Sequence, residues 1–233
     1  MTGDGSVLLD LKRDKYIGLG KKDTELLAAA IETWPKPQWQ HAELGPDRYS
    51  AMARTQELCR SLASDGLLLS GVSQGVQTAQ KRIDMKREWV SVGDELEVVS
   101  KVTVSHVTNF VAAFLWARYS LAWRPFSATV ESVRAAKARC GGRLEVDSTR
   151  MLEMAALVDI FRQLRPLVFA AEGRCLLHAL TLIRFLTHYD LYPEWVIGVA
   201  TQPWSAHAWV QSGGFLLDTN PEKVCRYTPI MVV

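Results

Sequence analysis

The chain has 233 residues, of which 48% are hydrophobic and 22% are charged, and its formal net charge is +2. This length suits one large domain or two small ones with a sizeable buried core. The charge is nearly balanced, and no basic stripe is present that would neutralise the phosphates of a nucleic acid. The first residues do not resemble a signal peptide, so we expect a cytoplasmic protein.

The cysteines and the absent motifs narrow the chemistry. Cys59, Cys140, Cys175 and Cys225 form no metal-spaced pair, and a reducing compartment would leave them free. The sequence contains no phosphate-binding loop of the Gly-x-x-x-x-Gly-Lys-Ser/Thr kind. We therefore predict no metal site and no cofactor, and any nucleotide dependence would need another site or another protein.

The first predicted elements are two strands, 6–11 and 15–20, separated by a charged turn. Asp23 and Thr24 then suit the cap of an apolar-faced helix. A second helical stripe runs over 49–62 and closes at a glycine, after which 67–69 are a candidate return strand. The front of the chain thus has a β-β-α-α pattern.

The middle of the chain changes composition. Residues 72–104 are polar and charged, which predicts a linker with one candidate short strand at 97–104. The run 107–123 is the most hydrophobic part of the chain, but Arg118 interrupts it and its apolar length falls short of the roughly 20 residues that a membrane span needs. We expect no membrane insertion and interpret it as a helix that is buried or lies between domains. Another helix is predicted over 151–164.

The most informative residue follows, where a glycine-containing loop gives way to an apolar helix pattern at Cys175. A thiol in the first helical turn feels the positive end of the helix dipole, and Arg174 lies beside it. Both features favour the thiolate. Cys175 is therefore a candidate nucleophile.

An imidazole and a carboxylate follow on a predicted β-hairpin. His207 and Asp218 lie in two apolar runs that flank a Ser-Gly-Gly sequence. If Ser212 and Gly213 form the loop, His207 and Asp218 are directly opposed; if Gly213 and Gly214 form it, they are diagonal neighbours on the same face. In either register the carboxylate could orient the imidazole for a thiol triad.

Each of these residues also has an ordinary structural interpretation. A cysteine that opens an apolar helix is often a small buried hydrophobe, and an aspartate after a strand often forms a turn. Together, Cys175, His207 and Asp218 favour a triad. His178 lies one turn beyond Cys175 and could touch the thiol, but the sequence places no carboxylate to orient it.

Several segments carry a family resemblance. Gly173-Arg174-Cys175-Leu176, Pro203-Trp204-Ser205-Ala206-His207-Ala208-Trp209-Val210 and Tyr227-Thr228-Pro229-Ile230 resemble the leader peptidase (B protein) of lasso-peptide biosynthesis. Those enzymes resemble transglutaminase-like cysteine proteases, whose triad falls here on Cys175, His207 and Asp218. The resemblance implies cleavage of a precursor peptide at the leader–core junction, with threonine as the penultimate leader residue. A separate asparagine-synthetase-like lasso cyclase would be a partner.

The front of the chain similarly resembles the winged-helix, PqqD-like leader-recognition domain of ribosomal-peptide pathways. The resemblance implies an α+β protein with a recognition domain at 1–80, a linker at 81–105 and a transglutaminase-like, papain-like cysteine peptidase domain at 106–233. The leader would add as a strand at the sheet edge. We expect the peptide-binding residues to be Tyr16, Ile17, Gly18, Leu19, Leu58 and Leu62, although several of them could instead be core.

Alternatives remain for both halves. A winged helix can bind DNA, but the segment 48–69 carries only three cations. In the C-terminal half, an amine rather than water could resolve the thioester, which would make the protein an acyltransferase. A non-catalytic carrier that presents the precursor to the cyclase is the third interpretation.

Overall fold

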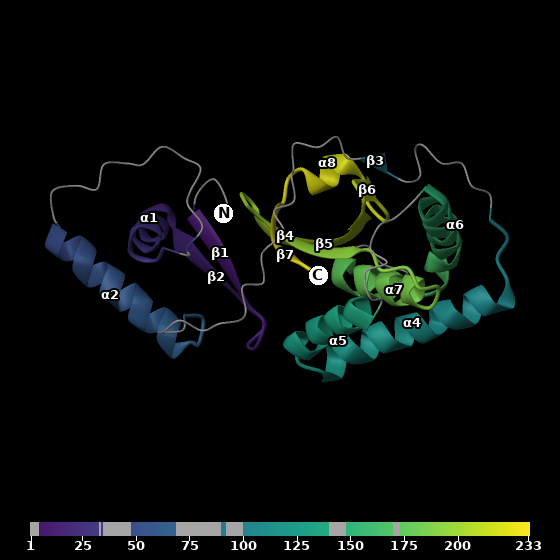
Figure 1. Ribbon diagram of the computed structural model, residues 1–233, viewed down its shortest axis with the longest axis horizontal. Coiled ribbons are helices and arrows are strands. Elements are labelled where there is room, and N and C mark those ends of the chain that lie inside the picture. Colours follow the sequence, from purple (N-terminus) through teal and green to yellow (C-terminus); the bar gives the residue numbers. More distant parts are fainter. Residues whose placement is uncertain are drawn as a thin grey trace. The chain divides into compact units, whose positions relative to one another are not determined.

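The computed structural model describes residues 5–32, 34, 48–68, 90–91, 100–139, 148–169 and 173–233. The chain divides into two compact units, one formed by residues 1–10 and 15–80 and the other by residues 11–14 and 81–233. Figure 1 labels their helices and strands. In the described residues no helix has the length and apolarity that crossing a membrane requires.

The N-terminal unit contains a two-stranded antiparallel sheet and two helices. Strand β1 spans Gly5–Asp10 and β2 spans Lys15–Gly20, followed by α1 over Lys21–Ala30 and α2 over Arg48–Ser64. Their apolar faces meet in a core of four buried leucines, Leu19, Leu27, Leu58 and Leu62. The first two strands and the two helices predicted here are confirmed.

Two details of this unit differ from the prediction. Gly20, and not Asp23 or Thr24, is the N-cap of α1, and no side chain caps the helix. The Thr24 hydroxyl instead lies within the first turns and donates to the Leu19 carbonyl at 3.4 Å. Residues 67 and 68 form a bend and not a strand, because their amides bond back to the Leu62 carbonyl at the end of α2. Leu69 lies outside the described residues.

In the described part of the C-terminal unit, four longer helices follow strand β3 (Val90–Ser91). They are α4 (Val104–Trp123), α5 (Phe126–Arg139), α6 (Ser148–Leu164) and α7 (Cys175–Thr187), with the short 3-10 helix η1 (Arg165–Leu167) after α6. Thr103 caps α4 through a capping box with His106, so the described part of the candidate strand, 100–103, leads into a helix. The helix predicted over 151–164 is confirmed.

Helix α4 packs mainly along α7 and also contacts α5 and α6. Phe110, Ala113 and Ala117 are fully buried. Val111, Leu115, Tyr119 and Trp123 recur every four residues on the other side and are 40%, 58%, 58% and 80% exposed. The expectation of a buried helix is therefore wrong for this side of α4, and the alternative, a helix between domains, stays a prediction.

The sheet of this unit comprises β4 (Glu194–Thr201), β5 (Trp204–Ser212), β6 (Phe215–Leu216), β7 (Thr228–Val232) and the two-residue β3 (Val90–Ser91). The strand order is β3-β6-β5-β4-β7, and only the β3–β6 pair among these is parallel. The short helix α8 (Pro221–Val224) precedes β7.

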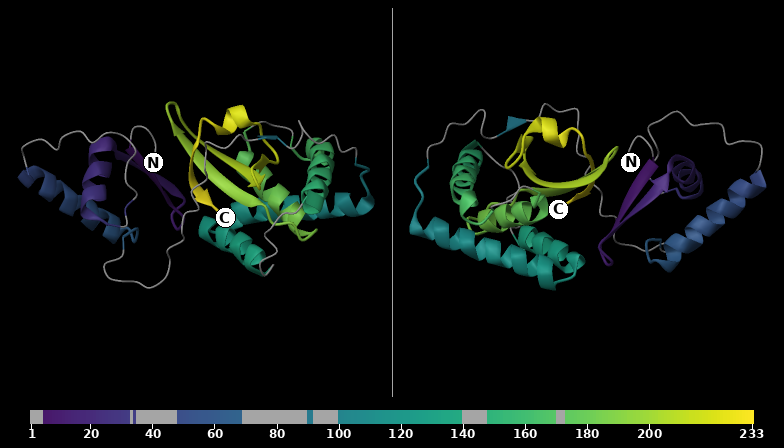
Figure 2. Two further views of the ribbon diagram at one scale, coloured as in Figure 1. Left: turned by 45° about the horizontal axis from the view of Figure 1, so that its top comes forward. Right: turned by 180° about the vertical axis from the view of Figure 1, so that it is seen from behind.

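The two faces of this sheet carry different partners. Trp195 of β4 meets Phe126 of α5 edge-on, with ring centroids 5.8 Å apart. Its neighbour Val196 points the other way and packs with Trp209 and with Val224 of α8. Figures 1 and 2 show α4, α5 and α7 on one side of the sheet and α8 on the other. The candidate triad residues come from α7, β5 and the segment after β6.

Candidate active site

Cys175 is the first residue of α7, as the sequence predicts. Gly173 has a φ of 102°, a left-handed conformation that suits glycine where the loop turns into the helix. Arg174 is the N-cap residue, and no side chain caps the helix. The Cys175 thiol is partly buried and belongs to no disulfide. The unpaired backbone amides of the first turn thus lie beside the thiol.

His207 lies on β5 and is buried, with 7% of its surface exposed. It is paired with Gly198 of β4. Its ring lies against Trp209, with centroids 6.1 Å apart, and against Tyr227, at 5.3 Å. Because His207 and Trp209 are two residues apart on one strand, both face α8, on the side of the sheet opposite to α7 and Cys175 (Figure 1). The sheet therefore holds the imidazole among aromatic rings.

The surroundings of His207 lower its pKa to about 4. Burial is the largest cause, because it penalises the charged imidazole. The charge of Lys223 lowers the pKa further, Asp218 opposes the shift and His178 adds a smaller lowering. His207 is therefore neutral at pH 7. Its Nε2 is buried without a hydrogen-bond partner among the described residues.

The hairpin uses the second of the two predicted registers. Gln211 pairs with Leu216 and Ser212 with Phe215, so Gly213 and Gly214 form the turn. Their φ angles are 58° and 100°, the left-handed values that a type I′ turn requires at both positions. The register with His207 directly opposite Asp218 is not present. The recorded pairing ends at Leu216, two residues before Asp218.

The Asp218 carboxylate bonds to a different imidazole from the expected one. Its Oδ1 accepts a hydrogen bond from the Val210 amide at 3.1 Å, and its Oδ2 lies 3.1 Å from His178 Nδ1. The statement that no carboxylate is placed to orient His178 is therefore wrong. The reason is that β6 ends at Leu216, so Asp218 lies beyond the ladder and meets α7.

His178 is the residue whose contact the sequence did not reveal. Its ring meets Phe161 and Phe169 edge-on, each with centroids 5.2 Å apart. The side chain is 13% exposed, and its Nε2 is buried without a hydrogen-bond partner in the described part of the chain. The spacing of three residues from Cys175 was visible in the sequence, but the carboxylate comes from 40 residues further on.

The predicted peptide-binding residues divide into two groups. Leu19, Leu58 and Leu62 lie in the core of the N-terminal unit. Tyr16 is 39% exposed, Ile17 is half-buried and Gly18 is exposed, all on β2. The exposed members therefore come from the strand and not from the helix.

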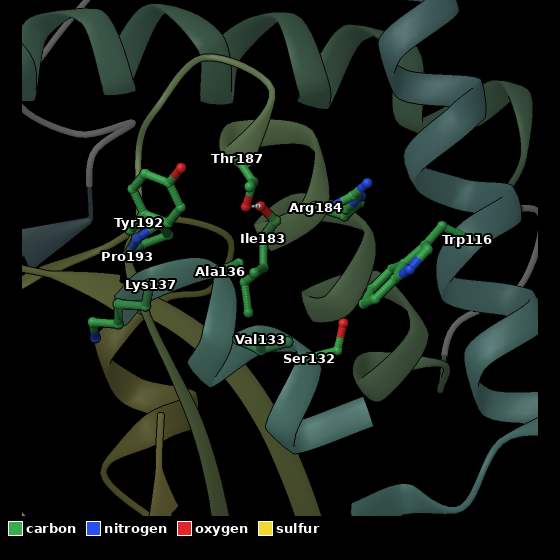
Figure 3. Close-up of a pocket in the computed structure, with 10 residues that line it drawn as sticks. All are labelled: Trp116, Ser132, Val133, Ala136, Lys137, Ile183, Arg184, Thr187, Tyr192 and Pro193. Carbon is green, nitrogen blue, oxygen red and sulfur yellow. Dashed lines mark hydrogen bonds between the residues drawn. The ribbon is translucent and has the colours of Figure 1, made fainter. Parts of the chain in front are cut away.

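The described cavity of the C-terminal unit lies away from Cys175. Trp116, Val133, Ile183, Arg184 and Thr187 are among its lining residues, from α4, α5 and the end of α7 (Figure 3). Ile183 is eight residues beyond Cys175, which is about 12 Å along a helix. In the described residues, no group of three or more His, Cys, Asp or Glu side chains gathers as a metal site would.

The comparison with protein families gives one match. The family model described as "Transglutaminase-like superfamily" matches residues 112–232, more than half of the chain. This range begins within α4 and contains all of α7 and the strands β4 to β7, with Cys175, His207 and Asp218. Searches of curated proteins and of solved structures gave no match.

Proposed function

The chain belongs to the transglutaminase-like superfamily, and we propose that it is a cysteine endopeptidase that removes the leader from a lasso-peptide precursor. The superfamily includes cysteine proteases and acyltransferases. The observation that carries the proposal is the position of Cys175 at the first residue of α7, inside the matched range. A helix N-terminus favours a negatively charged thiolate.

In the proposed reaction, Cys175 Sγ attacks the carbonyl carbon at the leader–core junction and forms a thioester to the leader. The proposal requires the proton to pass through His207 to the departing amine of the core, so that the peptide bond breaks as the thioester forms. Among the described residues His207 Nε2 has no hydrogen-bond partner, so this transfer requires a contact with Cys175 that forms in the substrate complex. Water then attacks the thioester, with His207 accepting its proton, and releases the leader as a carboxylic acid. The Cys175 backbone N–H is the candidate oxyanion donor.

His207 is neutral at pH 7, as a base must be, but its pKa of about 4 makes it a weaker base than an ordinary imidazole. Asp218 is the third member of the proposed triad and acts on His207 through its charge, which raises the pKa of that imidazole against the effect of burial. The negative charge would stabilise the imidazolium that forms during the reaction. This electrostatic role requires no hydrogen bond between the two side chains.

Substrate selection is assigned to the N-terminal unit, proposed as a winged-helix leader-recognition domain. Strand β2 carries the exposed candidates Tyr16 and Gly18. A leader that adds as a strand would bind through backbone hydrogen bonds, with alternate side chains giving selectivity. Tethering the leader would raise the local concentration of the scissile bond. The freed core would then pass to a separate lasso cyclase.

The test compares thiol variants on one substrate. The full chain is incubated with a synthetic lasso-precursor peptide that has threonine at the penultimate leader position. Cys175→Ala should abolish cleavage, whereas Cys59→Ala and Cys225→Ala should cleave as the parent does. Circular dichroism checks that each variant is folded. Equal cleavage by Cys175→Ala would reject the nucleophile assignment.

The product mass separates the peptidase from its rivals. Hydrolysis leaves the leader with a free carboxylate, whereas an acyltransferase supplied with an amine such as glycinamide leaves an amide. Predominant amide formation at low amine concentration would favour the acyltransferase. Leader binding by the parent chain without any cleavage would favour the carrier.

A further inference from the structure

One hydrogen bond joins the helix of the candidate nucleophile to the hairpin of the candidate base. His178 Nδ1 of α7 lies 3.1 Å from Asp218 Oδ2, which follows β6. The other carboxylate oxygen, Oδ1, accepts the Val210 amide of β5 at 3.1 Å. The Asp218 side chain is 5% exposed, so these contacts replace water around a buried carboxylate.

The imidazole is fixed on both sides. Phe161 of α6 and Phe169 meet its ring edge-on, each at 5.2 Å. The contact between Nδ1 and Oδ2 needs one proton, and we assign it to Nδ1, which makes His178 the donor. The remaining nitrogen, Nε2, is buried and has no partner among the described residues. The ring can thus bind Asp218 through Nδ1 in one orientation.

We propose that His178 is a positioning residue, which holds the Asp218 carboxylate against α7 and so fixes the charge that His207 needs. The inference rests on the proposed triad. In this role His178 acts through Asp218 and not directly on the substrate. Because the same contact links α7 to β5, it also sets the placement of Cys175 relative to the hairpin.

The rival role for His178 is that of general base, since it lies one turn beyond Cys175 on the same helix. The two roles make different demands on the ring. Positioning needs only a donor at Nδ1, whereas a base needs a second nitrogen that can take a proton. Asparagine supplies a donor near the Nδ1 position and has no basic nitrogen.

The decisive experiment therefore compares His178→Asn with His178→Phe in the full chain. Cleavage of the synthetic precursor should stay within about threefold of the parent in His178→Asn. In His178→Phe, kcat should fall about 10-fold to 100-fold and KM should stay unchanged, because misplacing a catalytic group costs about this much in rate. Loss of all activity in His178→Asn, or parental activity in His178→Phe, would overturn the proposal.

A second measurement uses no substrate, so it separates this inference from the proposed function. Nitrogen-15 NMR of the histidines should show His178 as the Nδ1–H tautomer in the parent, and Asp218→Asn should change that signal. The titration of His207 should shift in His178→Phe and remain parental in His178→Asn. An Nε2–H tautomer for His178, or a His207 titration indifferent to both variants, would contradict the positioning role even if no peptide were cleaved.

Discussion

Two largely buried imidazoles in the C-terminal unit have opposite surroundings. His207 lies on a strand against two aromatic rings, and its Nε2 has no hydrogen-bond partner among the described residues. His178 lies on α7 and faces a carboxylate. We assign His178, which has the hydrogen bond, to positioning. We assign His207, which has none among the described residues, to the role of base. The proposed assignment therefore predicts that the imidazole paired with the carboxylate is not the catalytic one.

The largest expected effect concerns the base itself. His207→Gln should lower the rate of precursor cleavage by about 1000-fold, because general acid–base catalysis contributes on this scale. His188→Ala is the matched control, since His188 is exposed at the other end of α7, and it should retain the parental rate. Cleavage by His207→Gln at more than a tenth of the parental rate would show that another residue acts as the general base.

Acid stability tests the burial of His207. Its folded pKa of about 4 lies below the ordinary 6.5, so the unfolded chain binds the proton more readily. The associated stability is present above pH 6.5 and is lost as the pH falls towards 4. A shift of this size corresponds to about 3 kcal/mol. Urea unfolding between pH 7 and 4.5 should show a steeper loss for the parent than for His207→Gln, and equal slopes would contradict the assignment.

The aromatic setting of His207 depends on Gly198. A Cβ at this position would lie 2.8 Å from two ring atoms of Trp209 and 3.0 Å from Tyr227 Cβ. Gly198→Ala should therefore destabilise the protein by about 2 kcal/mol, the usual cost of overpacking. Gly18→Ala is the matched strand control because a Cβ there meets open space. Equal unfolding midpoints in urea for these two variants would show that the ring can move aside.

The smallest effect concerns a remote charge. Lys223 is exposed, and its charge lowers the pKa of His207 less than burial does. Lys223→Ala should raise the pKa of His207 slightly, as followed by NMR titration, and added salt should reduce the difference between the variants. Lys101→Ala provides the comparison of another exposed lysine. A downward shift in Lys223→Ala would reverse the inferred sign.

Local signals in the sequence predicted the parts of the site that local structure determines. The start of α7 at Cys175 follows from a glycine loop that meets an apolar helical period. The glycines after Ser212 predict the hairpin, and the sequence left open only whether Ser212 and Gly213 or Gly213 and Gly214 form the turn. The left-handed φ angles of Gly213 and Gly214 explain the outcome, because serine adopts such angles less readily than glycine.

Tertiary contacts were not predictable in the same way. The bond between His178 and Asp218 depends on where β6 ends and on how α7 packs beside β5, and neither is encoded in a spacing. The hydrophobic run at 107–123 correctly predicted a helix. Because the run has no polar face, the sequence did not indicate that one side of the helix is exposed. Periodicity reports a face only when the opposite face is polar.

The exposed side of α4 has a practical consequence for spectroscopy. Val111, Leu115, Tyr119 and Trp123 offer environment-sensitive dyes an apolar surface in the folded protein. Dye fluorescence would then start high and report unfolding poorly. Trp195 and Trp209 are fully buried, whereas Trp123 and Trp204 are 80% and 52% exposed. A red shift of the intrinsic tryptophan emission, to which these two buried indoles contribute, is the better signal of lost tertiary structure.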